Sequence, residues 1–538
     1  MMVMVVFVTL SGLSISTAFG QLMRPSTYGM MAGDSTLSGL IGTGISDIKE
    51  SSNAIWLGSG HGISKTTDDG ETFRSFSRQF SNISYGGVSA MAVQGDTAWF
   101  AFAIDSLVGE EMMQTGTGIA RTLDGGQNWT LLPQPMDSLR WIYEWNSDHT
   151  AIVDSSSEVY SSIHLFGQVL DAVDVVTPIK NVTFDLAFDG KRLWASSFAG
   201  GLRKSYDLGD TWERVLLPWD DYTELDSLLL VNLQSEIIAD SSSHYFVIDP
   251  VLHLNHRVFS VIAWGDTIWA GSAGGANFSR DGGRSWKHYS SSTSNMSGNW
   301  IVAMHRQNRN DGSMVIWAST VTTGGSEVTG LSYFREDEKY WYTTMPNKRF
   351  HNFASSGVAI YAAGEDGLFK SKDGDHFAVF PPIQSADGSS NIFSDAAYSV
   401  LVRDDGGVWV GTGDGLAITY NEGLTWQIEK AQAQLSGQTL IAFPNPFYPS
   451  LSKQLKNEGH LIIQYDALVG QSTTVKIFDW VMSEVATLQD GNSIASSGSQ
   501  EIYWTGRNSA GQLVSNGTYF VQLKAGDDIS WTKVMVIN

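Results

Sequence analysis

Carboxylates that fall in predicted loops are the side chains of this sequence best suited to chemistry. A glycoside hydrolase needs two of them at a defined separation across a cleft. The carboxylates predicted to lie on one loop face, where a pair could act in this way, are Asp105, Glu110, Glu111, Asp220, Asp221, Glu365, Asp366 and Asp414. The chain holds 56 acidic residues, so carboxylates are expected in loops without catalysis. We therefore name no catalytic residue, and whether the protein is an enzyme stays open.

Other reactive or metal-binding side chains are scarce. The sequence has no cysteine, which excludes thiolate metal sites and cysteine nucleophiles. His253 and His256 lie on a segment expected to be extended, where side chains three residues apart point to opposite sides. We predict no metal and no cofactor. The formal charge of −23 repels phosphate backbones and argues against a nucleic acid partner.

A repeated unit supplies the strands and turns that must position these side chains. An apolar strand with one aromatic residue recurs at Trp56, Trp99, Trp194, Trp269, Trp317, Tyr361 and Trp409. A polar box of pattern Ser/Thr-x-Asp-x-Gly-x-x-Trp/Phe follows most copies, and it is one residue short after Tyr361 and decayed after Trp317. The predicted box residues are Asp68, Gly70, Asp124, Gly126, Asp207, Gly209, Asp281, Gly283, Asp373, Asn421 and Gly423.

The composition of the box predicts a structural turn. Its Asp can accept hydrogen bonds from nearby backbone N–H groups, and its Gly can take the positive φ that other residues resist. The hydroxyl ties the incoming strand to the turn, and the closing aromatic residue is large enough to fill space between sheets. We therefore expect the box to stabilise the turn of a hairpin, rather than to bind calcium or to catalyse a reaction.

Each unit also has a strand before the aromatic one, which gives four short antiparallel strands. Such a unit cannot bury both of its faces alone, and radial stacking of several units solves this problem. The sequence therefore predicts an all-β chain in which residues 21–430 form a β-propeller of about seven blades, with eight or more as an alternative.

The box resembles the Asp-box, or BNR, repeat of sialidases, sortilin-type receptors, xyloglucan-active glycosidases and a photosystem assembly factor. The resemblance implies the propeller fold but no single activity, because the repeat occurs on enzymes and on binding proteins alike. The Arg-Ile-Pro motif of sialidases is absent, since Met23-Arg24-Pro25 does not match it. The catalytic residues of sialidases are therefore not carried over.

One face of the predicted ring holds the irregular loops. If the strands of a blade are called A to D from the axis outward, the boxes are C–D turns, and the B–C and D–A loops lie on the opposite face. Insertions at residues 105–118 and 321–329, and long connections at 132–180 and 216–256, fall there. The two long connections resemble each other and are either decayed blades or hairpins. The candidate binding residues on this face are Asp105, Glu110, Glu111, Ser272, Glu365, Asp366 and Asp414.

The first twenty residues are typical of a signal peptide. An apolar stretch precedes Ala18-Phe19-Gly20, which resembles a cleavage site, although no Lys or Arg comes before the stretch. No later segment is long and apolar enough for a transmembrane helix. We expect an exported protein that is secreted or associated with the outer surface.

Residues 431–442 are predicted to be a linker, and residues 443–538 a small β-sandwich built from alternating strands. The motif residues in this segment are Pro444, Asn445, Pro446, Trp504, Gly506, Asn508, Gly511, Gly517 and Tyr519. They resemble the Ig-like domain of flagellar hook-capping proteins and the C-terminal sorting domain of type IX secretion cargo. The resemblance implies a bacterial protein that meets secretion machinery through this domain, and a purely structural module is the alternative.

Two functions fit these observations. The first is an exported bacterial propeller that acts as a binding or assembly module at the cell surface, with an unknown protein or glycan ligand. The second is a secreted glycoside hydrolase that uses two carboxylates on the B–C loop face.

Overall fold

The computed structural model describes residues 39–51, 54–78, 81, 83–109, 111–137, 143–145, 151–153, 160–232, 247–248, 253–322, 324–385, 391–392, 394–431, 440–443, 445–449, 460–494 and 498–537. No helix in this part of the chain is long and apolar enough to cross a membrane.

Seven antiparallel sheets, each built from four consecutive strands, make up most of the described chain. Blade one consists of β1 (Ile45–Ser51), β2 (Ala54–Ser59), β3 (Gly62–Thr66) and β4 (Arg74–Phe76). Blade two consists of β5 (Gly87–Gln94), β6 (Thr97–Val108), β7 (Glu111–Thr122) and β8 (Thr130–Leu132). Blade three consists of β13 (Thr183–Phe188), β14 (Leu193–Ser197), β15 (Gly201–Ser205) and β16 (Glu213–Val215). Blades four and five are β19 (Val258–Trp264), β20 (Thr267–Ser272), β21 (Ala276–Ser279), β22 (Trp286–Tyr289); and β23 (Trp300–Asn308), β24 (Met314–Val321), β25 (Gly330–Arg335), β26 (Tyr340–Thr344). Blades six and seven are β27 (Phe350–Ser356), β28 (Ala359–Gly364), β29 (Gly367–Ser371), β30 (Phe377–Val379); and β31 (Ala397–Val402), β32 (Val408–Thr412), β33 (Gly415–Thr419), β34 (Gln427–Glu429). Strand β17 (Glu224–Leu225) adds a fifth strand to the outer edge of blade four.

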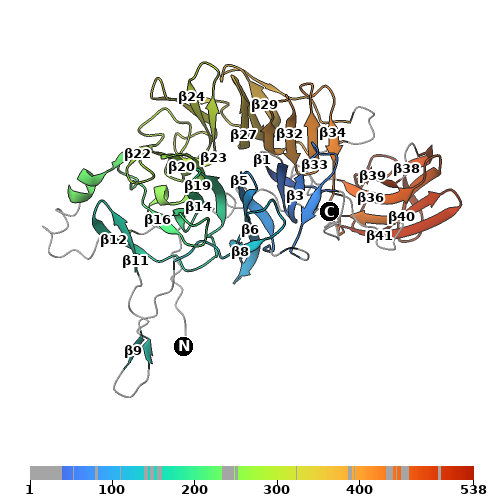
Figure 1. Ribbon diagram of the computed structural model, residues 1–538. Coiled ribbons are helices and arrows are strands. Elements are labelled where there is room, and N and C mark those ends of the chain that lie inside the picture. The colour runs from blue at the N-terminus through green and yellow to red at the C-terminus, as the bar shows by residue number, and fades with distance from the viewer. Residues whose placement is uncertain are drawn as a thin grey trace.

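The seven blades form a closed ring. The innermost strands β1, β5, β13, β19, β23, β27 and β31 contact one another in this order, and β31 contacts β1. Figure 1 shows the blue first blade beside the orange last blade. No strand of the described residues is shared between these two blades. Packing and ion pairs connect them, including Arg403 with Glu50 and with Asp69. The predicted β-propeller is confirmed, and its blade number in the described chain is seven.

Aromatic side chains of the second strands fill the spaces between blades. Trp56, Trp99, Trp194, Trp317 and Trp409 are all fully buried. Each buries a large apolar area, which is the dominant favourable contribution to folding. The recurrence of an aromatic residue at this position predicted the blades because every blade meets the same packing requirement.

In the residues that the structure describes, the two long connections do not form further blades. Strands β11 (Tyr160–Leu165) and β12 (Gln168–Val173) of the first connection pair with β18 (Val247–Ile248) of the second, in one three-stranded sheet. Ile163 and Leu170 of this sheet pack into the core that blades three and four share. The first connection also holds a hairpin of β9 (Tyr143–Trp145) and β10 (Ala151–Val153). For the described parts of the two connections, the alternative of decayed blades is therefore wrong.

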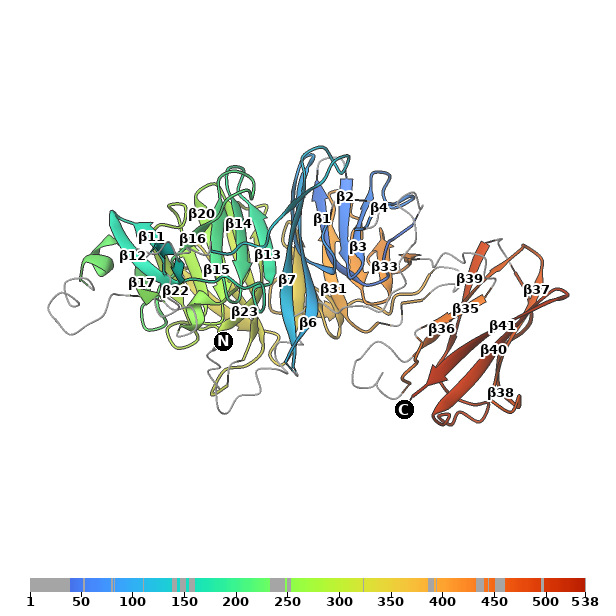
Figure 2. The ribbon, with the colours of Figure 1, turned by 90° about the horizontal axis from the view of Figure 1, so that it is seen from below.

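The C-terminal segment folds into two packed sheets. One has the order β35 (Leu440–Phe443), β36 (Leu461–Ala467), β39 (Gly498–Trp504); the other has the order β38 (Glu484–Ser493), β37 (Ser472–Phe478), β40 (Gly517–Ala525), β41 (Asp528–Val536). Their inner faces share one buried core that contains Ile463, Val475, Trp504 and Val521. In Figure 2 the first sheet lies nearer the ring. Strand β35 begins inside the stretch predicted as linker, because Leu440 pairs with Tyr465 and is buried.

Candidate functional site

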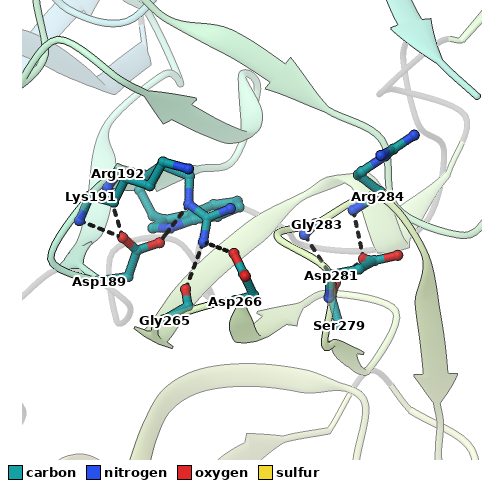
Figure 3. A network of polar contacts seen from close by, with 10 residues as sticks. Asp189, Lys191, Arg192, Gly265, Asp266, Ser279, Asp281, Gly283 and Arg284 are labelled. Atoms are coloured by element: carbon teal, nitrogen blue, oxygen red, sulfur yellow. Dashed lines mark hydrogen bonds and ion pairs between the residues drawn. The ribbon is translucent and has the colours of Figure 1, made fainter.

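The polar boxes use their hydrogen-bonding groups inside their own turns. In blade four, Ser279 Oγ donates to Asp281 Oδ1 (2.9 Å) and accepts from the Gly283 N–H (3.0 Å). Asp281 also accepts the N–H groups of Arg284 and Ser285, as Figure 3 shows for Arg284. Such bonds favour the ionised carboxylate.

Bonds of the same kind shift the acidity of other boxes. Bonds from the N–H and the side chain of Asn128 lower the pKa of Asp124 to about 2. The Thr211 hydroxyl, with other bonds of the turn, lowers the pKa of Asp207 to about 2. In blade seven Asn421 takes the Asp position and accepts the Thr425 N–H in the same way.

On the face that carries the boxes, hydrogen bonds also connect neighbouring blades. Arg192 of blade three donates to Asp189 of its own turn (2.7 Å) and to Asp266 of blade four (2.8 Å). Its guanidinium also donates to the Gly265 carbonyl (2.6 Å), and Figure 3 shows it between the two blades. These hydrogen bonds therefore hold blade three against blade four.

On the opposite face, the hairpin of β6 and β7 reaches beyond the rest of blade two. Asp105 and Glu111 are exposed near its end, and Glu110 lies outside the described residues. Leu107 and Met112 pair across the hairpin and are 68% and 64% exposed. The insertion predicted at residues 105–118 is thus an extension of two strands rather than a separate loop.

The remaining candidate binding residues are held by neighbouring groups. Asp366 pairs with Lys348 (2.8 Å), and Glu365 lies 3.8 Å from Arg349. Ser272, predicted to face a ligand, is fully buried and donates to Asn255 (2.5 Å). This prediction for Ser272 is wrong, because its hydroxyl fastens the chain entering blade four to the turn after β20.

The two histidines of the second connection come together, contrary to the expectation of an extended segment. Residues of η1 (Leu254–His256) form a 3₁₀ turn, capped by Asp220, which accepts the Leu254 and Asn255 N–H groups. The rings of His253 and His256 therefore lie 5.7 Å apart. Burial lowers the pKa of His256 to about 4. Within the described residues, no group of three or more His, Asp or Glu side chains could hold a metal.

A central cavity of about 310 Å³ lies between the innermost strands. Every innermost strand has a β-bulge near its first residues, where one residue has no direct partner. A bulge re-aims the side chains that follow it. Polar side chains lining the cavity come from four different blades and are Lys49, Glu50, Asp185, His305, His351, Asn352 and Ser355.

The cavity groups suit binding better than acid–base chemistry. His305 Nε2 lies 2.9 Å from Ser355 Oγ, and burial lowers the pKa of His305 to about 4, so the imidazole is neutral at pH 7. Both cavity carboxylates accept hydrogen bonds from neighbouring blades: Asp185 accepts the Val261 N–H (3.0 Å), and Glu50 accepts the Arg403 Nε–H (2.9 Å). Sequence reasoning missed this site, because a bulge leaves no mark in the residue pattern.

Asp414 belongs to the contact between ring and sandwich. Lys430, after the last strand of blade seven, donates to Asp414 (3.0 Å) and to the Tyr503 hydroxyl (2.9 Å). The Tyr503 hydroxyl in turn donates to Glu501 (2.8 Å). Burial raises the pKa of Glu501. The Asp414 carboxylate is therefore engaged in joining the two units.

The motif residues of the C-terminal segment lie at turns and in the core. Trp504 donates to the Arg507 carbonyl (2.8 Å), and Asn508 accepts the N–H groups of Ala510 and Gln512. Asn445 accepts the Met535 N–H and Tyr519 donates to the Ser515 carbonyl. Positive φ angles occur at Gly506, Gly511 and Gly517. Pro446 follows Asn445 through a cis peptide bond, and Pro444 lies outside the described residues.

No protein-family model and no curated protein matches the chain. Among solved structures it is similar to PorZ, an essential bacterial surface component of the type-IX secretion system of Porphyromonas gingivalis, at 12% identity over 92% of this chain and 75% of that chain, with a TM-score of 0.31. The GH74 xyloglucanase from Xanthomonas campestris gives 12% identity over 93% and 74% with a TM-score of 0.48. YCF48 from Cyanidioschyzon merolae gives 13% identity over 70% and 91% with a TM-score of 0.34. Similarities this distant transfer no activity, and the closed ring of seven blades itself makes the chain a β-propeller protein.

Proposed function

We propose that this chain is an exported bacterial binding or assembly module of the cell surface. Its ring binds a protein or glycan ligand at the B–C loop face and the central cavity, and its C-terminal sandwich serves sorting or anchoring. The observation that carries the proposal is the asymmetry of the ring. The box face uses its polar groups in its own turns and in bonds between blades, whereas the opposite face extends the exposed hairpin of β6 and β7.

The hairpin has the features of a contact surface. Leu107 and Met112 expose apolar area at the end of two long strands, with Asp105 and Glu111 beside them. Exposed apolar side chains rimmed by polar ones are common at sites where proteins meet partners. Loops and extensions on a rigid scaffold are also where binding functions concentrate.

The experiment for the ring compares two shortened chains in a bacterium that exports the protein. In the first, residues 105–117 are replaced by a two-residue Asn-Gly turn. In the matched control, the turn at residues 309–313 between β23 and β24, which lies on the box face, is shortened. We expect chemical cross-linking at the cell surface to lose its partner species only in the first chain. An unchanged cross-linking pattern in that chain, when it melts like the wild type, contradicts the proposal.

The experiment for the sandwich removes everything after residue 430. We expect the ring to cross the inner membrane but to lose retention at the cell surface, because the proposed sorting or anchoring segment is gone. Measurement of the protein in the periplasmic, surface and medium fractions tests this. Surface retention equal to that of the full chain contradicts the sorting and anchoring role.

Glycoside hydrolysis is the second candidate, favoured by the two exposed carboxylates Asp105 and Glu111. A hydrolase holds its carboxylates on opposite sides of a bound sugar, at a fixed separation. These two belong to one hairpin, and Glu365, Asp366 and Asp414 have cationic neighbours. The observation that would support glycoside hydrolysis is turnover of a glycan that a single Asp or Glu substitution abolishes.

A further inference from the structure

The outer part of the hairpin of β6 and β7 is a two-stranded ribbon. Strand β5 pairs with β6 as far as Ala103, and β8 pairs with β7 between Ile119 and Arg121. The pairing of β6 with β7 continues beyond both limits, to Val108 and Glu111. Figure 2 shows the two strands extending past the strands beside them.

The fold covers the β7 edge of this ribbon. The Lys180 N–H donates to the Gln114 carbonyl (2.7 Å), and the Gly116 N–H donates to the Pro178 carbonyl (3.0 Å). These two backbone groups of β7 therefore point away from β6. Residues 178–180 occupy the positions that an added strand would need on this side.

The β6 edge carries the same kinds of groups without a cover. Asp105 pairs directly with Gln114, and Leu107 pairs with Met112. In a direct antiparallel pair, both residues turn their backbone groups toward each other or both turn them away, in alternation along the strand. Because the Gln114 carbonyl points away from β6, the N–H and C=O groups of Asp105 and Leu107 point away from β7. In the described part of the chain, no backbone group bonds to them.

This edge also lacks the usual protection against pairing. Proteins protect open strand edges with short strands, lysine, proline or bulges. The outer strands β4, β8, β16, β30 and β34 of the ring have three residues each. By contrast, residues 104–108 of β6 contain no proline, lysine or arginine, and Leu107 is 68% exposed. An edge left open in a ring whose other outer edges are short indicates a role in binding.

We propose that the edge of β6 at residues 104–108 binds an extended segment of a partner protein as an added β-strand. Backbone N–H and C=O groups at strand spacing match the backbone of another strand, which is how several sheet proteins recognise peptides. A glycan carries hydroxyl groups but no alternating amide donors and carbonyl acceptors. The inference rests on the proposed function, because it names the class of partner that the hairpin contacts.

The charge of the hairpin favours a basic partner strand. Residues 104–117 contain no lysine or arginine and three acids, which are Asp105, Glu110 and Glu111. Lys180 lies beyond β7, on the side away from the β6 edge. Arg78 stacks on Tyr85, whose carbonyl accepts the Thr117 hydroxyl at the base of β7. The open edge therefore lies beside acids, whereas the cations lie at the base and on the covered side.

The same charges argue against a second copy of this chain as the partner. Two copies paired through this edge would bring their acids together, and each copy carries −23. Opposite charges and apolar pairs stabilise direct cross-strand neighbours. We therefore expect a lysine or arginine opposite Asp105 and an apolar residue opposite Leu107.

The probe for the test is a labelled peptide, Thr-Lys-Thr-Val-Thr-Lys-Thr with blocked ends, whose charged face reads the same in both directions. We expect the purified full chain to raise its fluorescence polarisation, and added salt to weaken the binding. The same peptide with Glu for Lys should bind at least about fivefold more weakly. Peptides methylated at alternate backbone nitrogens, in the two possible phases, should differ, because one phase alone blocks the bonds to β6. Absence of binding by the lysine peptide, or equal binding by the two methylated phases, overturns the proposal.

Paired variants test the edge itself. Leu107→Pro removes the outward N–H and keeps the bonds to β7, whereas Leu107→Ala removes the side chain and keeps the N–H. The proline variant should bind the peptide about tenfold more weakly than the alanine variant, because a peptide carbonyl loses its donor. The Met112 N–H lies on the other edge, so Met112→Pro and Met112→Ala should bind equally. Melting curves check that all four variants fold, and equal binding by the two Leu107 variants overturns the proposal.

Cross-linking at the cell surface separates this inference from the proposed function. If replacement of residues 105–117 removes the partner species but the two Leu107 variants behave alike, the proposed function stands and the added strand is rejected. If the shortened chain keeps its partner species, the proposed function itself fails. A dimer of the purified chain that Leu107→Pro dissociates also overturns the inference, because the occupant is then a second copy.

Discussion

Gly70 in the first blade lies against the indole of Trp409 in the last blade, where a Cβ on Gly70 would stand 3.0 Å from Trp409 Cη2. The same relationship links Gly126 to Trp56 and Gly283 to Trp194, always from one box to the preceding blade. The box glycine thus has two tasks. It takes a positive φ in its turn, and it leaves room for the neighbouring tryptophan.

Gly70→Ala should destabilise the ring more than Gly406→Ala does. Gly70 and Gly406 have φ angles of 89° and 88°, but only Gly70 has a neighbour within reach of a new Cβ. Both variants incur backbone strain of about 1–3 kcal/mol, and Gly70→Ala adds about 1–3 kcal/mol of overpacking against Trp409. Urea unfolding of the two variants measures the difference. Equal losses would mean that the indole adapts and does not fix the closure.

Asp207→Asn should make unfolding less sensitive to acid. The folded pKa of Asp207 is about 2, below its unfolded value near 3.8, so ionised Asp207 stabilises the fold above about pH 4. That stabilisation is lost as pH falls from about 4 to about 2, because the unfolded chain binds the proton more readily. Asparagine has nothing to titrate. Melting temperatures across this range should therefore converge for the two proteins at low pH.

Blade seven offers the reciprocal control for this effect. Asn421 already makes the box bonds with an amide, including one from its Nδ2 to Thr425 Oγ1 (2.8 Å). Asn421→Asp should therefore add acid sensitivity in the same pH range. If neither variant changes the pH profile, the box carboxylates do not contribute to stability through their ionised form.

Lys430→Met should loosen the sandwich from the ring. The substitution removes the donor that joins Asp414 to Tyr503 and takes a positive charge away from the Asp414 and Glu501 carboxylates. Lys370→Met is the matched control, because both lysines sit 5.1 Å from a tyrosine ring and pair with one carboxylate. Small-angle X-ray scattering should show a larger radius of gyration for Lys430→Met alone. Identical scattering from both variants would show that other contacts hold the two units together.

Glu501→Gln should stabilise the sandwich at neutral pH. Burial raises the folded pKa of Glu501 above its unfolded value, so the folded state binds the proton more tightly. The wild type therefore loses stability as pH rises from about 4.5 through the folded pKa. Glutamine still accepts the Tyr503 hydrogen bond and carries no charge. The melting temperature of Glu501→Gln should equal that of the wild type near pH 4 and exceed it by a growing margin toward pH 7. A margin that does not change with pH would contradict this prediction.

Local patterns predicted the ring, and contacts between distant segments escaped prediction. The aromatic strands and boxes recur because every blade solves the same packing problem, so Trp56 and Trp409 could be aligned from the sequence alone. The sheet of β11, β12 and β18 joins strands about eighty residues apart through short pairings that leave no pattern.

In the candidate site, too, local features could be predicted from the sequence and tertiary contacts could not. Asp105 and Glu111 are exposed where the insertion predicted them, because an insertion changes spacing that can be counted. Ser272 and Asp414 were indistinguishable from ligand-facing residues, since their partners Asn255 and Lys430 are supplied by tertiary contacts. The central cavity depends on bulges in seven strands, which composition and periodicity do not record.

Turnover by the purified full chain most directly distinguishes a ring that binds from a ring that hydrolyses. The protein is incubated with plant and algal polysaccharides and with sialosides, and released reducing ends and free sugars are measured. A ring that binds rather than hydrolyses predicts no release above that of a heat-denatured sample. Release that Asp105→Asn or Glu111→Gln abolishes, in a variant that still melts like the wild type, would contradict it.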